Sequence, residues 1–402
     1  MTSGRLAVAV VGAGRWAQRA HIPGWQRDGR AEVVALADTN ADALAEAAAK
    51  FGVARTTTDY RELTDDPSID VIDVVTGNRP HYEISWAALS AGKHVLCEKP
   101  VNHDYRKTRE AAELAASKGL KTKVGFTFRY APAVQYAKSL IDSGFVGEPY
   151  IFNGYEQNSQ WIDPATPLRQ VDPAADPDTI TVSSIEGYGA PVIDIMHWWL
   201  GEPLRSVVGT MRNFVPVRMI RDTGKMTRAN IDDGDMWIAE FGASPGGRPP
   251  GAPRGGGILA SIQSSYVTVG NYPGIEARIY GSEGAVIARL VDEFGICQTI
   301  KIATKDSVEF KEVEIPAEFF PPGGHSGEPW EFLFYSNLIA DFITEIASDQ
   351  AVCQGDFGQA ALVQETINAF EASFRRRAWV DFPLTAETAQ GVGAGGTTRD
   401  QA

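Results

Sequence analysis

The first third of the chain alternates short apolar runs with amphipathic segments. Continuous apolar runs of four to seven residues, rich in β-branched side chains, are typical of strands buried on both faces. The intervening segments have the spacing of helices, and such alternation predicts a parallel, doubly wound sheet. The expected strands are 6–11, 32–37, 71–76, 94–97 and 121–126, and the expected helices are 42–51, 81–91 and 105–118.

The pattern changes after Phe128. Strand-like runs separated by turns predict one large, mostly antiparallel sheet with few helices. A Pro/Gly-rich stretch at 242–257 predicts a mobile loop, and the tail 385–402 is predicted to be disordered. The domains expected are therefore 1–127 and 128–384. The strands are expected at 150–154, 207–214, 236–241, 258–267, 277–280, 285–288 and 298–303, and the helices at 133–143, 331–347 and 357–375.

Composition narrows the class of protein. The chain has 402 residues and a net charge of −14, which disfavours nucleic acid and anionic membranes as partners. Three cysteines fit a reducing cytoplasm, and no apolar run reaches the roughly 20 residues that span a bilayer. The start of a signal peptide remains an alternative reading of LAVAVVGAG at 6–14. No metal site is predicted.

A glycine turn follows the first strand. Gly12-x-Gly14-x-x-Ala17 lies between a strand and a helix, where such a turn lets a pyrophosphate approach the free N–H groups of a helix N-terminus. Asp38 ends the second strand, where a carboxylate can accept both hydroxyls of an adenosine ribose. Alternatively, the glycine segment is an ordinary turn between a strand and a helix, and Asp38 is a helix cap. Together the two signals predict a dinucleotide, and Asp38 without an adjacent Arg or Lys predicts NAD rather than NADP.

Polar residues also follow the third and fourth strands, whose carboxyl ends line the same crevice. Asn78 and His81 come after the third strand, and Glu98-Lys99-Pro100 ends the fourth. A lysine there can donate to a substrate oxygen and exchange a proton with it. Alternatively, Asn78 and His81 belong to an ordinary turn and helix start, and Glu98 and Lys99 to a solvated strand end.

The chain resembles the Gfo/Idh/MocA family of NAD(P)-dependent oxidoreductases over nearly its whole length. The resemblance is carried by VGAGRWAQRAHIPGW, ADTN, VVTGNRPHYEISWAALSAGKHVLCEKP, VGFTFRYAPAV, LIDSGFVGEPY, APVIDIMHWWLGEP and IEARIYGSEGAVI. It implies a Rossmann domain followed by an α+β domain with a large open, mostly antiparallel sheet, whose exposed face often pairs subunits. NSQWIDPATPLRQ looks closest to branches that oxidise pyranoses.

The resemblance also implies roles for residues of the site. Glu98 would touch the nicotinamide ribose, Lys99 would reach both cofactor and substrate hydroxyl, and the Lys99–Pro100 bond is often cis in the family. The cofactor-binding residues expected are Gly12, Gly14, Arg15, Trp16, Asp38, Thr76, Asn78, His81, Glu98, Lys99 and Arg129. The substrate-binding residues expected are Lys99, Arg129, Tyr155, Trp161, Asp194 and His197.

One departure from the family affects catalysis. The family commonly carries an Asp and a His where this chain has Gly187 and Pro191. Asp194 is retained, so Lys99 and Asp194 are the expected catalytic residues, with Tyr188 as a possible substitute for the missing Asp. His197 is either a sugar contact or a packing residue, and Tyr188 is alternatively a core aromatic.

The sequence therefore predicts a cytoplasmic, NAD-dependent dehydrogenase that acts on a secondary hydroxyl of a sugar, glycoside or cyclitol. It predicts a homodimer or homotetramer that pairs through the exposed face of the second sheet. Two alternatives remain: a redox-neutral enzyme that keeps and recycles its NAD, and a catalytically silent protein that senses cofactor or sugar.

Overall fold

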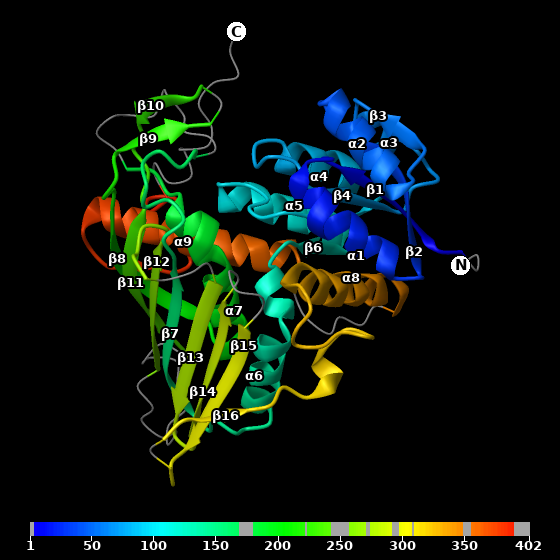
Figure 1. Cartoon of the computed structure of the whole chain (residues 1–402). Helices are drawn as coiled ribbons and strands as arrows, with labels where there is room; N and C mark the ends of the chain where they lie inside the picture. Colours follow the sequence, from blue (N-terminus) through cyan, green and yellow to red (C-terminus); the bar gives the residue numbers. More distant parts are fainter. Residues whose placement is uncertain are drawn as a thin grey trace. The chain divides into compact units, whose positions relative to one another are not determined.

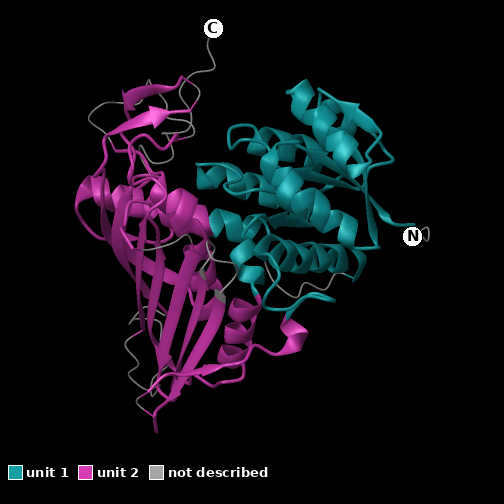
Figure 2. Cartoon of the chain, in the orientation of Figure 1, with its two compact units in different colours: residues 1–131, 320–362 teal, residues 132–319, 363–402 magenta. Residues whose placement is uncertain are grey.

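The computed structural model describes residues 4–168, 180–221, 223–242, 257–270, 274–291, 297–307, 309–348 and 355–389. Most of the predicted loop 242–257 and the tail beyond residue 389 lie outside these residues. The chain forms two compact units (Figure 2). Unit 1 comprises residues 1–131 and 320–362, and unit 2 comprises residues 132–319 and 363–402.

Unit 1 is built on a six-stranded parallel sheet in the order β3-β2-β1-β4-β5-β6 (Figure 1). This is the order of a doubly wound dinucleotide-binding sheet, so the predicted fold is confirmed. The short β3 was not predicted, since its Arg-Thr-Thr sequence has no apolar run. The strands are β1 Leu6–Val11, β2 Ala31–Ala37, β3 Arg55–Thr57, β4 Val71–Val74, β5 His94–Cys97 and β6 Thr122–Val124.

The helices of unit 1 include one that comes from late in the sequence. Helix α8 (Trp330–Ser348) is tied to unit 1 by buried polar contacts: Lys123 Nζ lies 3.0 Å from Asp341 Oδ2, and Tyr130 donates a 3.0 Å hydrogen bond to the same carboxylate. A single division of the sequence after residue 127 leaves out this return of residues 320–362 to unit 1. The other helices are η1 Ala17–His21, α1 Ile22–Arg27, α2 Ala41–Phe51, α3 Arg61–Thr64, α4 His81–Ser90, α5 Tyr105–Ser117 and η2 Thr127–Tyr130.

Unit 2 is built on a nine-stranded sheet in the order β16-β15-β14-β13-β7-β12-β11-β8-β17. Every pair is antiparallel except β7 with β12, so the predicted, mostly antiparallel sheet is confirmed. The strands are β7 Pro149–Gln157, β8 Leu204–Arg212, β11 Gly234–Phe241, β12 Ile258–Ser265, β13 Gly274–Gly281, β14 Gly284–Val291, β15 Cys297–Thr304, β16 Lys311–Val313 and β17 Val380–Asp381.

One face of this sheet is covered by helices. The ring of Phe152 on β7 packs against Trp199 on α7, and Trp237 on β11 packs against Phe370 on α9. The opposite face exposes apolar side chains, with Met236, Ile238 and Leu259 all about half accessible to solvent. The helices are α6 Pro132–Asp142, η3 Ile185–Gly189, α7 Ala190–Leu200, η4 Ala317–Phe319 and α9 Phe357–Arg376.

A small hairpin adds to unit 2. Strands β9 (Val217–Ile220) and β10 (Lys225–Arg228) pair with each other, and Ile220 also bridges to Leu168. The hairpin was not predicted from the sequence. Leu168 also belongs to a small apolar cluster in which Trp161 and Tyr188 pack against the buried Tyr266.

Candidate functional site

The glycine turn between β1 and η1 has the backbone that a dinucleotide cradle requires. Gly12 has φ +107°, and a Cβ there would lie 2.5 Å from the carbonyl of Val75, so only glycine fits. At Gly14, by contrast, an added Cβ would meet nothing within 4 Å. The chain can therefore offer open space above the turn, next to the free N–H groups at the start of a helix.

Asp38 at the end of β2 is fixed to this turn. Its Oδ2 accepts a 2.7 Å hydrogen bond from the backbone N–H of Ala13, and its Oδ1 accepts a 2.8 Å bond from that of Asn40. The two bonds orient the carboxylate at the carboxyl edge of the sheet while each oxygen keeps a further lone pair. The turn and Asp38 thus lie together, and their geometry fits a dinucleotide.

The loop after β4 is joined to the loop after β5 by His81. Its ring nitrogens lie 2.8 Å from the carbonyl oxygen of Pro100 and 3.2 Å from that of Thr76. The side chain is almost fully buried, and this burial lowers its pKa. His81 therefore fixes the two loops in place, whereas Asn78 is exposed beside it.

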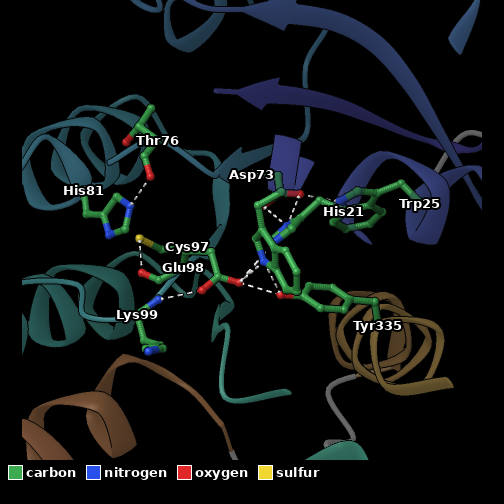
Figure 3. A network of polar contacts seen from close by, with 10 residues as sticks. His21, Trp25, Asp73, Thr76, His81, Cys97, Glu98, Lys99 and Tyr335 are labelled. Carbon is green, nitrogen blue, oxygen red and sulfur yellow. Dashed lines mark hydrogen bonds and ion pairs between the residues drawn. The ribbon is translucent and has the colours of Figure 1, made fainter. Parts of the chain in front are cut away.

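Glu98 and Lys99 follow directly on β5. The Lys99–Pro100 peptide is cis, as the resemblance implied. The Glu98 carboxylate packs against Gly125, where a Cβ would lie 2.5 Å from Oε1, and its Oε2 accepts a 3.2 Å bond from the backbone N–H of Lys99. The Lys99 side chain extends away from the groups that bind Glu98 (Figure 3).

Glu98 belongs to a network of polar side chains from four elements (Figure 3). Its Oε1 lies 2.6 Å from the hydroxyl of Tyr335, 3.1 Å from Nε2 of His21 and 3.3 Å from Nε1 of Trp16. His21 Nδ1 in turn lies 2.9 and 3.0 Å from the two carboxylate oxygens of Asp73. These contacts join η1, β4, β5 and α8 within unit 1.

His21 and Glu98 are charged in this network although little solvent reaches them. Burial alone would lower the pKa of His21, but Asp73 and Glu98 raise it to about 9. Burial alone would raise the pKa of Glu98, but hydrogen bonding and attraction from His21, with help from Tyr335 and Lys99, lower it to about 2. At neutral pH the site therefore holds an imidazolium between two carboxylates.

His21, Asp73 and Tyr335 were not predicted as site residues. Asp73 could have been noticed, because an acid inside the apolar run Val71–Val74 needs a buried partner. His21 and Tyr335 lie 77 and 237 positions from Glu98 in the sequence, so no local spacing connects them to it.

The start of α7 in unit 2 has the departure that the sequence indicated. Pro191 lies in the first turn of the helix, where its missing N–H costs nothing. An added Cβ at Gly187 would meet nothing within 4 Å. Asp194 is fully buried, and His197 is buried with its Nε2 2.9 Å from the hydroxyl of Thr366 on α9.

The predicted aromatic contacts of unit 2 do not all lie together. Tyr188 donates a 2.6 Å hydrogen bond to Gln160 and packs against Trp161, 5.9 Å away between ring centroids. Successive side chains of β7 point to opposite faces of the sheet, and Phe152 and Glu156 point toward the face that α7 covers. Tyr155 therefore points to the opposite face, where it lies against Arg278. The structure therefore groups Tyr188 with Trp161 and separates Tyr155 from them.

The surroundings of two predicted site residues, Arg129 and Tyr188, limit what their side chains can do. Arg129 in η2 is only 1% exposed, so its guanidinium is buried in unit 1. Burial, followed by the charge of Glu156, raises the pKa of Tyr188. The Tyr188 hydroxyl therefore remains protonated at neutral pH and is suited to donate a hydrogen bond rather than to accept a proton.

Unit 2 also buries three aspartates near the start of η3. Asp232 accepts hydrogen bonds from the backbone N–H groups of Ser183, Ser184 and Ile185, and Asp233 pairs with Arg218 at 2.8 Å. Asp235 accepts a bond from the Ser264 hydroxyl. Burial and then the charge of Asp232 raise the pKa of Asp235.

The comparisons with known proteins agree with this architecture. Residues 6–126 match the family model described as "Oxidoreductase family, NAD-binding Rossmann fold", and residues 134–287 match the "GFO/IDH/MocA C-terminal domain". The chain therefore belongs to the Gfo/Idh/MocA oxidoreductase family, with an NAD-binding Rossmann domain.

Individual relatives are sugar and cyclitol dehydrogenases. The chain is 28% identical over 270 residues to levoglucosan dehydrogenase of Pseudarthrobacter phenanthrenivorans, which covers 63% of each protein. It is 29% identical over 178 residues to inositol 2-dehydrogenase of Salmonella typhimurium, 44% of this chain and 49% of that protein. The chain thus matches less than two thirds of the length of either relative.

A solved structure shares the fold over a longer range. Levoglucosan dehydrogenase in complex with NADH superposes with a TM-score of 0.77 at 24% identity, covering 95% of this chain and all of that one. Among the described residues, no helix is long and apolar enough to cross a membrane.

Proposed function

We propose that this chain is an NAD-dependent dehydrogenase that transfers a hydride between nicotinamide and a secondary hydroxyl or ketone of a sugar, glycoside or cyclitol. The observation that carries the proposal is the anchored Glu98-Lys99-Pro100 element at the carboxyl end of β5, on the sheet that also bears the glycine turn and Asp38. The family membership and the names of the relatives support the same reaction class.

The residues of unit 1 divide the work of such a reaction. Gly12, Gly14 and the backbone of Arg15 and Trp16 would bind the pyrophosphate, and Asp38 would bind the adenosine ribose. NAD supplies the hydride acceptor when it is bound. Glu98 would hold the nicotinamide ribose, and the Lys99 amine would take the hydroxyl proton as the carbinol C–H leaves as hydride.

Unit 2 would contribute binding more than proton transfer. Gly187 and Pro191 have no ionisable side chain, and His197 is buried against Thr366. We therefore assign proton acceptance principally to Lys99, with a water as relay. Trp161, Asp194 and Arg129 remain predicted sugar contacts, and the facing of Tyr155 toward the other side of its sheet argues against a role for it.

A substrate panel tests the proposal. Purified protein is mixed with NAD and with levoglucosan, myo-inositol or a methyl glucoside, and formation of reduced nicotinamide is followed by its absorbance. Sugar-dependent reduction of added NAD supports the dehydrogenase. Reduced cofactor that survives dialysis and does not exchange supports the redox-neutral alternative. Exchangeable NAD with no turnover on any polyol supports the sensing alternative and contradicts the proposal.

We also propose a homodimer or homotetramer in the cytoplasm, paired through the outer face of the unit 2 sheet. Met236 and Ile238 on β11 and Leu259 on β12 are each 45% or more exposed there. Apolar side chains grouped on one sheet face favour an interface. Light scattering at micromolar concentration should give at least twice the 43.5 kDa mass of the chain, and a monomer would contradict this proposal.

Ile238→Lys should shift the assembly toward the monomer, because a charge would be buried in the proposed interface. Val217→Lys is a matched control, since Val217 is equally exposed but lies on the β9–β10 hairpin outside that sheet. An unchanged mass for Ile238→Lys would place the interface elsewhere.

A further inference from the structure

We propose that His21 is a positioning residue that is protonated at neutral pH and that holds the Glu98 carboxylate in place, with Asp73 fixing His21 from behind. The inference deepens the proposed function, because it rests on Glu98 as the contact for the nicotinamide ribose. It follows from the geometry of His21 in η1 and Asp73 in β4, both fully buried, and of Glu98, which directly follows β5 and is 13% exposed (Figure 3).

The Asp73 side of the network requires a donor at Nδ1 of His21. Asp73 is fully buried between the apolar residues of β4, where an unpaired carboxylate would be very costly. Its oxygens accept from Nε1 of Trp25 at 2.7 Å and face Nδ1 of His21 at 2.9 and 3.0 Å. An ionised carboxylate only accepts, so Nδ1 carries a proton.

The Glu98 side requires a second proton at Nε2. Glu98 Oε1 accepts from the Tyr335 hydroxyl at 2.6 Å and lies 3.1 Å from Nε2 of His21, while the single N–H of Trp16, 3.3 Å from Oε1, is closer to the Tyr335 hydroxyl at 2.8 Å. Gathering several donors around one oxygen is a sign of an ionised acceptor. A ring that donates from both nitrogens is an imidazolium, and its pKa is raised to about 9.

The arrangement leaves the carboxylate little freedom to turn. One oxygen is bound by His21 and Tyr335, the other by the backbone N–H of Lys99, and Gly125 closes the remaining side. The groups that face His21 from the packed elements are Asp73, Glu98 and the ring of Tyr335, whose centroid lies 4.7 Å away. Loss of the imidazolium would leave two buried carboxylates without their shared cation.

Nuclear magnetic resonance tests the charge without any need for turnover. The six histidines are labelled with ¹⁵N in the ring, and the signals of His21 are identified by their absence in His21→Gln. Both ring nitrogens of His21 should keep imidazolium shifts through pH 8, with a midpoint near pH 9. A midpoint at or below pH 7 would overturn the proposal, whatever the protein's substrate is.

Kinetics tests the positioning role. With a sugar that the protein oxidises, His21→Gln should lose at least about tenfold in kcat, while the KM for NAD changes less than about threefold. The reason is that the nicotinamide half of NAD would lose its fixed contact while the adenosine half, at Asp38, is untouched. Trp25→Phe is the matched control: it removes another donor to Asp73 but keeps the His21 charge, so it should lower only the melting temperature.

Two outcomes separate the alternatives. If His21→Gln folds and its kcat and pH profile equal those of the wild type, His21 is only structural and the positioning role is wrong. If no sugar is oxidised by the wild type, the proposed function fails, and the ¹⁵N titration still decides the charge of His21.

Discussion

Both units bury acidic side chains, but they treat the charge differently. In unit 1, Asp73 and Glu98 share the cation of His21, and the pKa of Glu98 falls to about 2. In unit 2, Arg218 is paired with Asp233, and the pKa of the nearby Asp235 is raised by burial and by Asp232. A cation in contact with a buried acid therefore lowers its pKa, whereas burial beside another acid raises it.

The comparison indicates where the chemistry lies. A fixed negative charge next to Lys99 suits a site that binds a cofactor and transfers a proton, whereas Asp235, whose pKa is raised by burial, lies in the interior of unit 2. The described part of unit 2 also has no ionisable side chain at the positions of Gly187 and Pro191. We therefore assign proton transfer to unit 1.

The largest effect is expected from Lys99. Lys99→Met should lose at least about 10²-fold in kcat while NAD affinity stays within a few-fold, since general base catalysis is typically worth 10²- to 10⁴-fold. His197→Ala should change kcat little, because its imidazole bonds Thr366 in the interior of unit 2. Steady-state kinetics and NAD titration of both variants check this, and the reverse pattern would assign the base to unit 2.

A second prediction compares neutral replacements of one acid from each unit. Glu98→Gln should lower the melting temperature at pH 7 by roughly 5 °C or more, because it removes a partner of the buried imidazolium. Asp235→Asn should shift it by less than about 3 °C, because burial raises the pKa of Asp235 and an uncharged amide replaces a carboxyl whose charge is disfavoured there. Calorimetry at fixed protein concentration checks both, and equal losses would remove the distinction between the units.

The same pair differs in pH dependence. The folded-state pKa of Glu98 is depressed, so its contribution to stability is present above about pH 4.5 and is lost as the pH falls toward 2. The folded-state pKa of Asp235 is raised, so its ionisation in the unfolded chain reduces stability as the pH rises above about 4. Melting curves of the two variants against pH should therefore deviate from the wild type in opposite directions.

A smaller effect concerns the choice of cofactor. A 2′-phosphate would face the Asp38 carboxylate, and a like-charge pair about 4 Å apart costs on the order of 4 kcal/mol at an effective dielectric of about 20 before rearrangement. A quarter of this, about 1 kcal/mol, already favours NAD by about fivefold in kcat/KM. Asp38→Asn should reduce this preference, and equal values for NAD and NADP in the wild type would contradict it.

The sequence predicted the elements whose patterns are local. The apolar runs located β1, β2, β4 and β5, and Gly12, Gly14 and Asp38 marked one edge of the parallel sheet in advance. Hairpin β9–β10 was missed because polar Arg218 and Lys225 break its pattern, although Arg218 is buried by its pairing with Asp233. The hairpin is therefore stabilised by a contact between residues that are distant in the sequence, which a local pattern does not show.

The candidate site was predictable only in part, for the same reason. Glu98 and Lys99 follow one strand and could be read directly, whereas the partners that fix Glu98 come from η1, β4 and α8. Tyr155 illustrates a different limit: its residue type suggested a sugar contact, but alternation along β7 directs it to the sheet face opposite Phe152 and α7, which argues against that contact.

Chemical rescue of Lys99→Ala tests the central claim most directly. The rate of nicotinamide reduction by this variant, with NAD and a sugar that the wild type oxidises, is measured at increasing concentrations of ethylamine. We expect a rate at least about 10²-fold below the wild type that rises with amine concentration, because the amine replaces the missing base. A variant that retains most of the wild-type rate without amine would show that the proton acceptor lies elsewhere.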